Sequence, residues 1–395
     1  MKRALALTLL AACTNTDVVA IDQGAGPDGG DVPPYCRGDG PPVLVGDGIT
    51  VGEGNGSSDD VCSGEIAVRT FRKAMCACED YVVSAELTTD SFDSAVGPYT
   101  PGGTEGAVGL NGRINTNAVL TIGGDLTSAG ASAVFGRDAS IAGDAAFAGP
   151  LGSNVNVDVA GNASVAGDIS LISLDVGGTL TYPATATSGS TAITATSTVR
   201  APVTVEPPCA CAPEDLVDIS DFVGSHRDDN ENALIGLTPD RLNNYSGDVT
   251  LELPCGRYYL APVHGQGALT IRAMGRVALL VDGDVSMTEP LRLELGTDDA
   301  ELDLMITGNL TTDSTIMAGN PDHPARTRIY VDGEGTLQLS GGAEFAANLY
   351  APKANLSTAG GLVMHGSVFA RRFDQSAPME IHYDVDVLRA DAGCL

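Results

Sequence analysis

The cysteines are the residues whose type and spacing give this chain its clearest capacity for chemistry. The 395-residue sequence contains nine of them, and four fall in two Cys-Ala-Cys pairs, Cys76/Cys78 and Cys209/Cys211. Such thiols either oxidise to disulfides or, as four thiolates, bind zinc or copper. With Cys13 set aside an even number remains, which in an exported chain predicts four disulfides of undetermined pairing. The candidate disulfide cysteines are Cys36, Cys62, Cys76, Cys78, Cys209, Cys211, Cys255 and Cys394.

The amino terminus resembles a bacterial lipoprotein signal. Two cations precede an apolar run over residues 4–10, and Leu10-Ala-Ala-Cys13 is similar to a lipobox. The resemblance implies that a signal peptide over residues 1–12 is removed and that acyl chains on Cys13 anchor the protein to a membrane. Residues 13–35 are then expected to be a flexible tether. We expect an outer membrane lipoprotein of the cell envelope, facing the periplasm or the surface; a chance cysteine in an ordinary signal peptide is the alternative.

Aspartates at turns are the second group that suggests a ligand. Calcium prefers hard carboxylate and carbonyl oxygens, and it is the one cofactor that the sequence suggests. Solvated corners are the competing explanation and the one that we prefer. The weak calcium candidates are Asp282, Asp284, Asp298, Asp299 and Asp303.

Catalytic patterns are missing from the sequence. The five histidines have no metal-ligand spacing such as HExxH, and no Gly-x-Ser-x-Gly elbow presents a nucleophile. A polysaccharide-cleaving site would also need a basic substrate clamp, and no Arg-Ile-Lys segment follows Asp298-Asp299. His382 lies between Ile381 and Tyr383, which favours a structural, hydrogen-bonded role. We therefore predict no catalytic residue and no enzymatic activity.

Composition limits the partners and the core. Hydrophobic residues make up 43% of the chain but aromatics only 5%, with no tryptophan, so we expect a core of Val, Leu, Ile and Ala. Lys and Arg number 21 against 51 Asp and Glu, a formal net charge of −30. This charge argues against nucleic acid as a partner, because phosphate binding needs clustered cations. The sequence contains no apolar run long enough for a membrane-spanning helix.

Two short helices are predicted. Ser63 is expected to cap the first, which places Ile66, Ala67 and Phe71 on one face before it runs into Cys76. The second begins at Pro213, with Glu214 and Asp215 in its first turn, and ends at Gly224. We expect these two helices to cover open ends of the β structure.

Glycine-marked repeats dominate the rest. The segment 138–144 (DASIAGD) returns as 162–168 (NASVAGD), and glycines recur at 283, 308 and 333 after β-branched strands. Repeats of this length indicate a solenoid. The fold class predicted is all-β, a right-handed parallel β-helix with aliphatic side chains inside and Gly, Asp and Asn at corners that need left-handed backbone. A β-sandwich is the alternative.

The chain is divided accordingly. After the signal and tether, we expect an N-terminal Cys-containing cap with a helix over residues 36–104 and a first β-helix segment over 105–205. A helical excursion over 206–246 then leads to a C-terminal β-helix segment over 247–395.

Five segments resemble an uncharacterised domain of secreted Gram-negative lipoproteins, with similar segments in adhesin-like and pilus-associated surface proteins. They are Leu253–Tyr259, Gly275–Asp284, Arg328–Val331, Asn348–Ala354 and Ile381–Asp384. The likeness covers about residues 209–394, and the N-terminal third is similar to the same group through Cys76–Cys78 and Asp90–Ser94. Val165–Ile169 more weakly resembles bactofilins. The resemblance implies a β-helical surface protein and brings no catalytic residue.

The expected function is a structural or adhesive display role without catalysis, toward an unknown surface partner or polysaccharide. One alternative is a β-helix that binds or cleaves polysaccharide. Another is a scaffold that polymerises end to end.

Overall fold

The computed structural model describes residues 17–19, 34–36, 41–46 and 60–394. The described chain is all-β with two α-helices, and its main sheet contains 26 strands. Further sheets have five, four and two strands. Only β2 (Val43–Val45) and β3 (Asp60–Cys62) pair antiparallel as named strands. All other strand pairs are parallel, which is not the pattern of an antiparallel β-sandwich.

The strands form three parallel ladders. The first ladder runs through thirteen strands in spatial order. Its strands are β21 (Val249–Leu253), β24 (Leu269–Ala273), β27 (Leu291–Leu295), β30 (Ile316–Gly319), β33 (Phe345–Ala346), β35 (Leu362–His365), β37 (Met379–Asp384), β6 (Leu87–Phe92), β9 (Leu120–Ile122), β12 (Ala139–Ile141), β15 (Asn156–Val159), β18 (Ser173–Tyr182) and β19 (Ala192–Arg200). A short strand, β1 (Asp17–Val19), pairs with β21.

The second ladder also runs through thirteen strands and ends on β18 and β19. Its other strands are β22 (Gly256–Leu260), β25 (Arg276–Val281), β28 (Glu301–Ile306), β31 (Thr327–Val331), β34 (Asn348–Ala359), β36 (Val368–Gln375), β4 (Met75–Ala77), β7 (Val108–Leu110), β10 (Leu126–Ser128), β13 (Ala145–Phe147) and β16 (Ala163–Val165).

The third ladder is interrupted and flanks the other two. One part contains β20 (Asn243–Ser246), β23 (Val263–Gln266), β26 (Val285–Met287) and β29 (Leu310–Thr312). The middle is β32 (Thr336–Ser340), which pairs with the second half of β34 and through it with that of β36. The last part contains β5 (Tyr81–Val83), β8 (Ile114–Thr116), β11 (Ala133–Phe135), β14 (Leu151–Gly152) and β17 (Ile169–Ser170).

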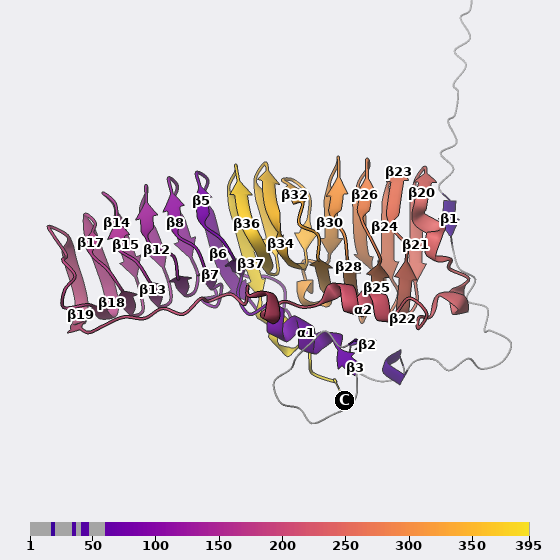
Figure 1. Ribbon diagram of the computed structural model, residues 1–395, viewed down its shortest axis with the longest axis horizontal. Helices are drawn as coiled ribbons and strands as arrows, with labels where there is room; N and C mark the ends of the chain where they lie inside the picture. Colours follow the sequence, from indigo (N-terminus) through magenta and orange to yellow (C-terminus); the bar gives the residue numbers. More distant parts are fainter. Residues whose placement is uncertain (1–16, 20–33, 37–40, 47–59, 395) are drawn as a thin grey trace, which may run out of the picture.

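The strands do not stack in sequence order. Strands from the C-terminal segment, β36 and β37, pair directly with β4 and β6 from the N-terminal segment. Figure 1 shows the consequence, a single rod in which the yellow C-terminal strands lie in the middle beside the purple N-terminal ones. β4, β5 and β6 fall in the range expected to be an N-terminal cap, and they lie inside this stack. From β19 the chain runs back below the strands to the opposite end (Figure 1).

Both predicted helices are present with shifted bounds. α1 (Ser63–Thr70) has Cys62 at its N-cap, so Ser63 is its first residue. α2 (Ile219–Ser225) begins after Asp218, whose side chain accepts from the Asp221 N–H at 3.0 Å, and Pro213–Asp215 forms a separate 3-10 turn. The other 3-10 turns are Pro34–Cys36, Asn232–Ile235, Pro239–Leu242, Pro324–Arg326 and Val385–Arg389.

The helices cover a flank of the rod, which corrects the expectation that they close its ends. α2 contacts β25 and β28 in the interior of the stack, and α1 contacts the turn at residues 385–389. Figure 1 shows both below the strands and away from either end. Their apolar faces bury against the sheet, as Ile66 and Phe222 are fully buried.

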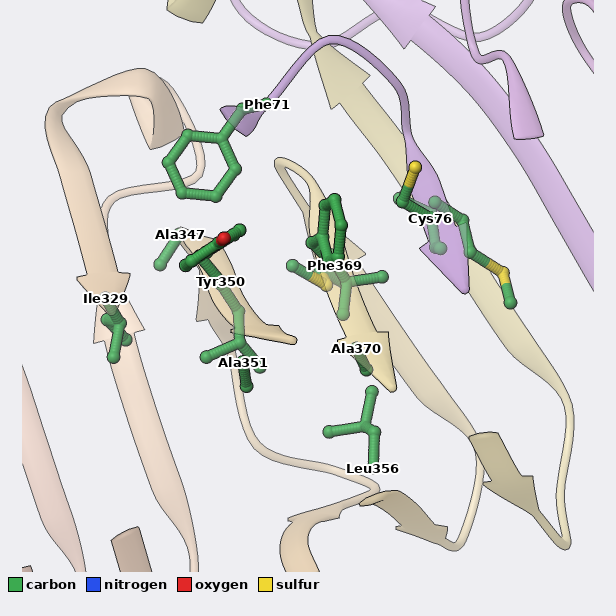
Figure 2. Packing of buried hydrophobic residues seen from close by; sticks show 14 of the residues in the cluster. Phe71, Cys76, Ile329, Ala347, Tyr350, Ala351, Leu356, Phe369 and Ala370 are labelled. Atoms are coloured by element: carbon green, nitrogen blue, oxygen red, sulfur yellow. The ribbon is translucent and has the colours of Figure 1, made fainter. Parts of the chain in front are cut away.

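The core is largely aliphatic, as the composition predicts. Strands such as β9 alternate buried, exposed and buried residues, so Leu120 and Ile122 face inward and Thr121 faces water. Beside α1 the core is aromatic instead: the Phe71 ring lies 5.6 Å from that of Tyr330, and Tyr350 lies 5.0 Å from Phe369. Figure 2 shows Phe71, Tyr350 and Phe369 together between the strands.

The polar corners hold successive layers together. The N–H of Asp144 donates to the Asp125 carboxylate at 2.8 Å, and the N–H of Asn162 donates to the Asp144 carboxylate at 2.7 Å. Gly143 has no positive φ, contrary to the expectation of left-handed backbone; a Cβ there would collide with Asp125. Glycine is required at this corner by the close approach of the next layer. Gly283, with φ of 131°, is a corner that does need the left-handed region.

Candidate functional site

The junction of the two strand stacks is the feature of the fold that brings most polar groups together. We call it the seam, meaning the boundary where β36 and β37 meet β4 and β6. The Tyr81 hydroxyl donates to Oε1 of Gln375 at 2.6 Å, and the Tyr383 hydroxyl donates to the Phe71 carbonyl at 2.7 Å. Side chains far apart in sequence therefore fasten one stack to the other.

Three titratable side chains follow one another across the seam. His365, His382 and Asp90 are register partners on β35, β37 and β6. Nδ1 of His382 lies 2.7 Å from Oδ1 of Asp90, and the Tyr99 hydroxyl donates to Oδ2 at 2.6 Å. The Tyr99 ring stacks on His382 with centroids 4.0 Å apart, and Phe92 lies 5.4 Å from Tyr99.

Burial and hydrogen bonding pull these groups in different directions. Burial acts to raise the pKa of Asp90, but hydrogen bonds from His382 and Tyr99 outweigh it and hold that pKa below its ordinary value. Burial lowers the pKa of His365, and the neighbouring His382 lowers it further. His365 is therefore favoured as neutral imidazole, with a buried Nδ1 that has no partner among the described residues.

The histidine cluster resembles part of a catalytic arrangement without completing one. In a hydrolytic triad a carboxylate orients an imidazole, and the imidazole acts as the general base toward a nucleophile. Among the described side chains, Asp90 is the one hydrogen-bonded to His382, so no hydroxyl or thiol is placed to be activated. Only 10% of the His382 side chain is exposed. The cluster can fasten the seam, which agrees with a structural role for His382.

An open groove of about 710 Å³ crosses the seam on the side of the third ladder. Four of its five charged groups pair with one another: Arg113 lies 2.8 Å from Asp80, and Arg372 lies 3.0 Å from Asp374, while Glu79 adds a further acid. Phe373 is the one aromatic residue of its lining and is 1% exposed. The groove therefore offers mixed charge but no aromatic face on which a sugar could stack.

All eight candidate disulfide cysteines form disulfides, which confirms that expectation. The two Cys-Ala-Cys pairs meet each other, as Cys76–Cys209 and Cys78–Cys211, so the four sulfurs proposed as a thiolate metal site are joined as disulfides instead. These two bonds fix the returning chain to β4 at the seam. The other two are Cys36–Cys255 and Cys62–Cys394.

The aspartates considered for calcium have separate protein partners. Asp303 is fully buried, with its carboxylate 2.6 Å from Nε of Arg328 and accepting from the Ser63 hydroxyl at 2.7 Å. Asp282 accepts from the Tyr259 hydroxyl at 2.7 Å. Asp284 accepts from the Asn309 N–H at 2.7 Å.

The remaining two, Asp298 and Asp299, lie in the turn before β28. The Asp298 carbonyl accepts from Arg326, and a hydrogen bond from Thr297 lowers the pKa of Asp299. Across the described residues, no three His, Cys, Asp or Glu side chains are arranged to hold a metal ion.

The predicted lipidation residue, Cys13, lies outside the described residues. Of the helices that the structure describes, none has the length and apolar character needed to cross a membrane.

Sequence reasoning missed Asp90, Tyr99, His365 and the buried Arg328. Arg328 bridges Asp303 and Glu301, at 2.7 Å from the latter, and ties β31 to β28. The spacing of His365 and His382 matches one layer of strands, which is the signal that could have paired them. Asp90 carries no such signal. It lies one layer beyond His382 in the stack but precedes His382 by 292 positions in the sequence.

These observations define an all-β protein with a long parallel sheet and four disulfides. Residues 211–389 match the model of a family described as a domain of unknown function (DUF7305). The match confirms that the C-terminal part resembles an uncharacterised domain, close to the expected range of 209–394. No curated protein matches the chain, and no solved structure matches it.

Proposed function

We propose that the protein is a lipid-anchored rod of the cell envelope with a structural or adhesive display role and no catalysis. The observation that carries this proposal is the pair of parallel ladders that each continue through thirteen strands. At about 4.8 Å per strand, twelve spacings give a rod about 58 Å long. A regular body of this kind holds its faces at fixed positions.

In this proposal the strands wind as a right-handed parallel β-helix, the finer form of the fold expected from the repeats. β7, β8 and β9 lie on the second, third and first ladders in turn, and β10 then returns to the second ladder beside β7. Three strands thus complete one turn. Right-handed winding follows the hand of nearly all parallel crossovers.

The disulfides support an exported location. Four disulfides are favoured in an oxidising compartment and rare in the cytosol. A net charge of −30 would keep such a rod soluble on its anchor.

The position of β1 gives the proposed rod an orientation. β1 pairs with β21 at one end of the first ladder, and Asp17 follows the proposed lipidation residue, Cys13, by only four positions. Acyl chains on Cys13 would therefore hold the β21 end at the membrane and leave the β19 end pointing away.

The anchor is tested by comparing the full chain with a Cys13→Ala variant in the producing cells. We expect the wild-type protein to incorporate labelled fatty acid and to sediment with membranes, and the variant to do neither. A Cys36→Ala variant is the control, because it removes a cysteine without touching the lipobox. Retention of Cys13→Ala in membranes would contradict the proposal.

A further inference from the structure

The two ends of the rod are finished differently. At the β22 end, residues 231–239 satisfy the outer edge of the strand: Asn232 exchanges hydrogen bonds with the backbone of Tyr259, and the Arg257 N–H donates to Glu231. The Ala261 N–H donates to the Pro239 carbonyl. Together with β1 on β21, these contacts cover the outer edges of β21 and β22 at that end.

The β19 end has no such cover in the part of the chain that the structure describes. β19 pairs with β18 alone, and its remaining hydrogen bonds also run back toward residues 169–186. The N–H of Ala192 donates to the Ile172 carbonyl in the preceding layer of the stack. Because backbone groups of successive residues point to opposite sides of a strand, the N–H and carbonyl of Ile193 face the open edge. A nine-residue edge strand is thus left ready for pairing.

The inward rows of the core are also unfinished at β19. Val157, Leu174 and Ile193 occupy consecutive positions of one row, and the first two are at most 1% exposed. Ile193 is only partly buried, as is Ala195, which continues the inward row of Val159 and Val176. Another layer of strands would complete the burial of these side chains.

Charge identifies what can supply that layer. Residues 176–199 contain no charged side chain, although the whole chain carries −30. Two copies repel each other over the rest of their surfaces, but not at this end. The one charge on β19 itself, Arg200, is turned back onto the Tyr182 ring and the carbonyls of Pro183 and Ala186. An edge of this kind in a polyanion therefore fits another copy of itself better than any cationic partner.

We propose that the β19 end binds the β19 end of a second copy. The pairing is about a two-fold axis, with the two β19 strands antiparallel, because the covered edges of β21 and β22 at the opposite end oppose a head-to-tail filament. The product is a closed dimer about twice as long as one rod. With the anchor of the proposed function at the β21 end, on which this part rests, the dimer would bridge two membrane surfaces.

The pairing is tested first without the anchor, on a Cys13→Ala protein, by sedimentation equilibrium and small-angle X-ray scattering at about 0.15 and 0.5 M salt. We expect a dimer of doubled length that strengthens with salt as repulsion is screened. A monomer at both salt concentrations, filaments, or a dimer of unchanged length would each overturn the proposal.

Two lysine variants provide the matched comparison. Thr194→Lys adds a charge to β19 beside Asp175, and Ser140→Lys adds one to β12 beside Asp158 in the same outer row. We expect Thr194→Lys to weaken the dimer about ten-fold or more, since a charged residue on an edge strand opposes pairing and both copies bring it to the same interface, and Ser140→Lys to have no effect. Circular dichroism and melting establish that both variants fold. Equal dimerisation of the two variants would contradict pairing through β19.

Liposomes separate the pairing from the anchor. We expect acylated wild-type protein to bind liposomes and cluster them, and acylated Thr194→Lys to bind without clustering. Failure of the acylated wild-type protein to bind liposomes would contradict the anchor alone. Binding of the wild-type protein to liposomes without clustering would contradict the end-to-end pairing.

Discussion

His382 and Asp90 are separated by 292 positions in the sequence, yet Nδ1 of the first lies 2.7 Å from Oδ1 of the second. They are register partners on β37 and β6, the strands at which the C-terminal stack continues into the N-terminal one. From β4 in the middle of the rod, successive strands lie progressively nearer the β19 end; the chain then returns along the rod, and the strands from β21 to β37 lie progressively nearer the middle again. The seam is where the two termini of the strand region are joined.

The two disulfides at the seam should contribute very unequally to the free energy of unfolding when they are removed one after the other. Cys76–Cys209 and Cys78–Cys211 close almost the same loop, each with a separation of 133 residues. While one is intact, the other closes only a few residues and is worth about 2 kcal/mol, whereas loss of the last one costs about 5 kcal/mol. Urea unfolding of the two serine double variants and the quadruple variant measures this. Equal losses at the two steps would contradict the shared loop.

Arg328 should be among the most sensitive positions of the core. Arg328→Met leaves the fully buried Asp303 carboxylate without its charge partner, at an expected cost of about 3–5 kcal/mol. Arg328→Met combined with Asp303→Leu should recover much of that loss. The surface pair gives the control: Arg372→Met, beside Asp374, should cost less than about 1 kcal/mol. Urea denaturation provides the values, and equal costs for the two Met variants would show that Arg328 does not neutralise a buried charge.

Corner carboxylates should stabilise the rod where acids on open strand faces do not. Asp144 accepts the N–H of the next layer's Asn162, whereas Asp158 is an exposed residue of β15. We expect Asp144→Ala to lower the free energy of unfolding by about 1 kcal/mol and Asp158→Ala by less than about 0.5 kcal/mol. Both variants remove one negative charge, so net charge does not explain a difference. Equal melting temperatures would mean that the corner hydrogen bond contributes nothing.

Acidification should loosen the contact between α2 and β2. His226 is fully buried, with Nδ1 2.8 Å from the Phe222 carbonyl and Nε2 accepting from the Val45 N–H at 3.3 Å. Burial lowers the pKa of His226 below 6.5. Because the unfolded chain binds the proton more readily, stability is present above pH 6.5 and is lost as pH falls through the lower folded pKa.

This pH dependence is measured by urea unfolding at about pH 7.5 and pH 5.5. We expect His226→Gln to lose less stability than the wild type between these two values, because glutamine does not titrate. His264→Gln, at a partly exposed position of β23, is the control and should behave as the wild type does. An unchanged pH dependence in His226→Gln would show that His226 does not titrate in this range.

The repeats predicted the strands but only part of their spacing. Gly283, Gly308 and Gly333 do stack one layer apart, with N–H to carbonyl distances of 3.1 Å between successive glycines. The offset of 24 between DASIAGD and NASVAGD is not one layer. Ala139 pairs with Val157, while Ala163 pairs with Ala145 on the other ladder.

Within residues 105–200 a layer contains three strands, and each strand with its following corner takes about six residues. An offset of 24 therefore spans four strands. A similarity between repeats shows their length but does not show how many of them complete a turn. That number depends on the angle at each corner. Gly-Asp corners such as Gly143-Asp144 occur on every ladder, so the residue types alone do not give the angle.

The seam could not have been predicted from the sequence by the same reasoning. The local sequence pattern predicts that β6 and β37 are strands, but no feature of either segment predicts that they pair with each other. The pairing of the two Cys-Ala-Cys motifs brings β4 and the returning chain together, and the eight cysteines alone allow 105 pairings. The seam depends on contacts between distant segments, such as the hydrogen bond of Tyr81 to Gln375.

A cysteine cross-link across the seam tests the continuous rod most directly. Thr88 and Glu380 are register partners on β6 and β37, so the pair Thr88→Cys and Glu380→Cys should form a disulfide that a non-reduced peptide digest detects by mass spectrometry. Val363 lies one layer beyond Glu380, about 10 Å from Thr88, so Thr88→Cys with Val363→Cys should stay unlinked. A linked 88–380 pair with an unlinked 88–363 pair is the result expected of a single rod. Free thiols at 88 and 380 in folded protein would show that the two stacks do not meet.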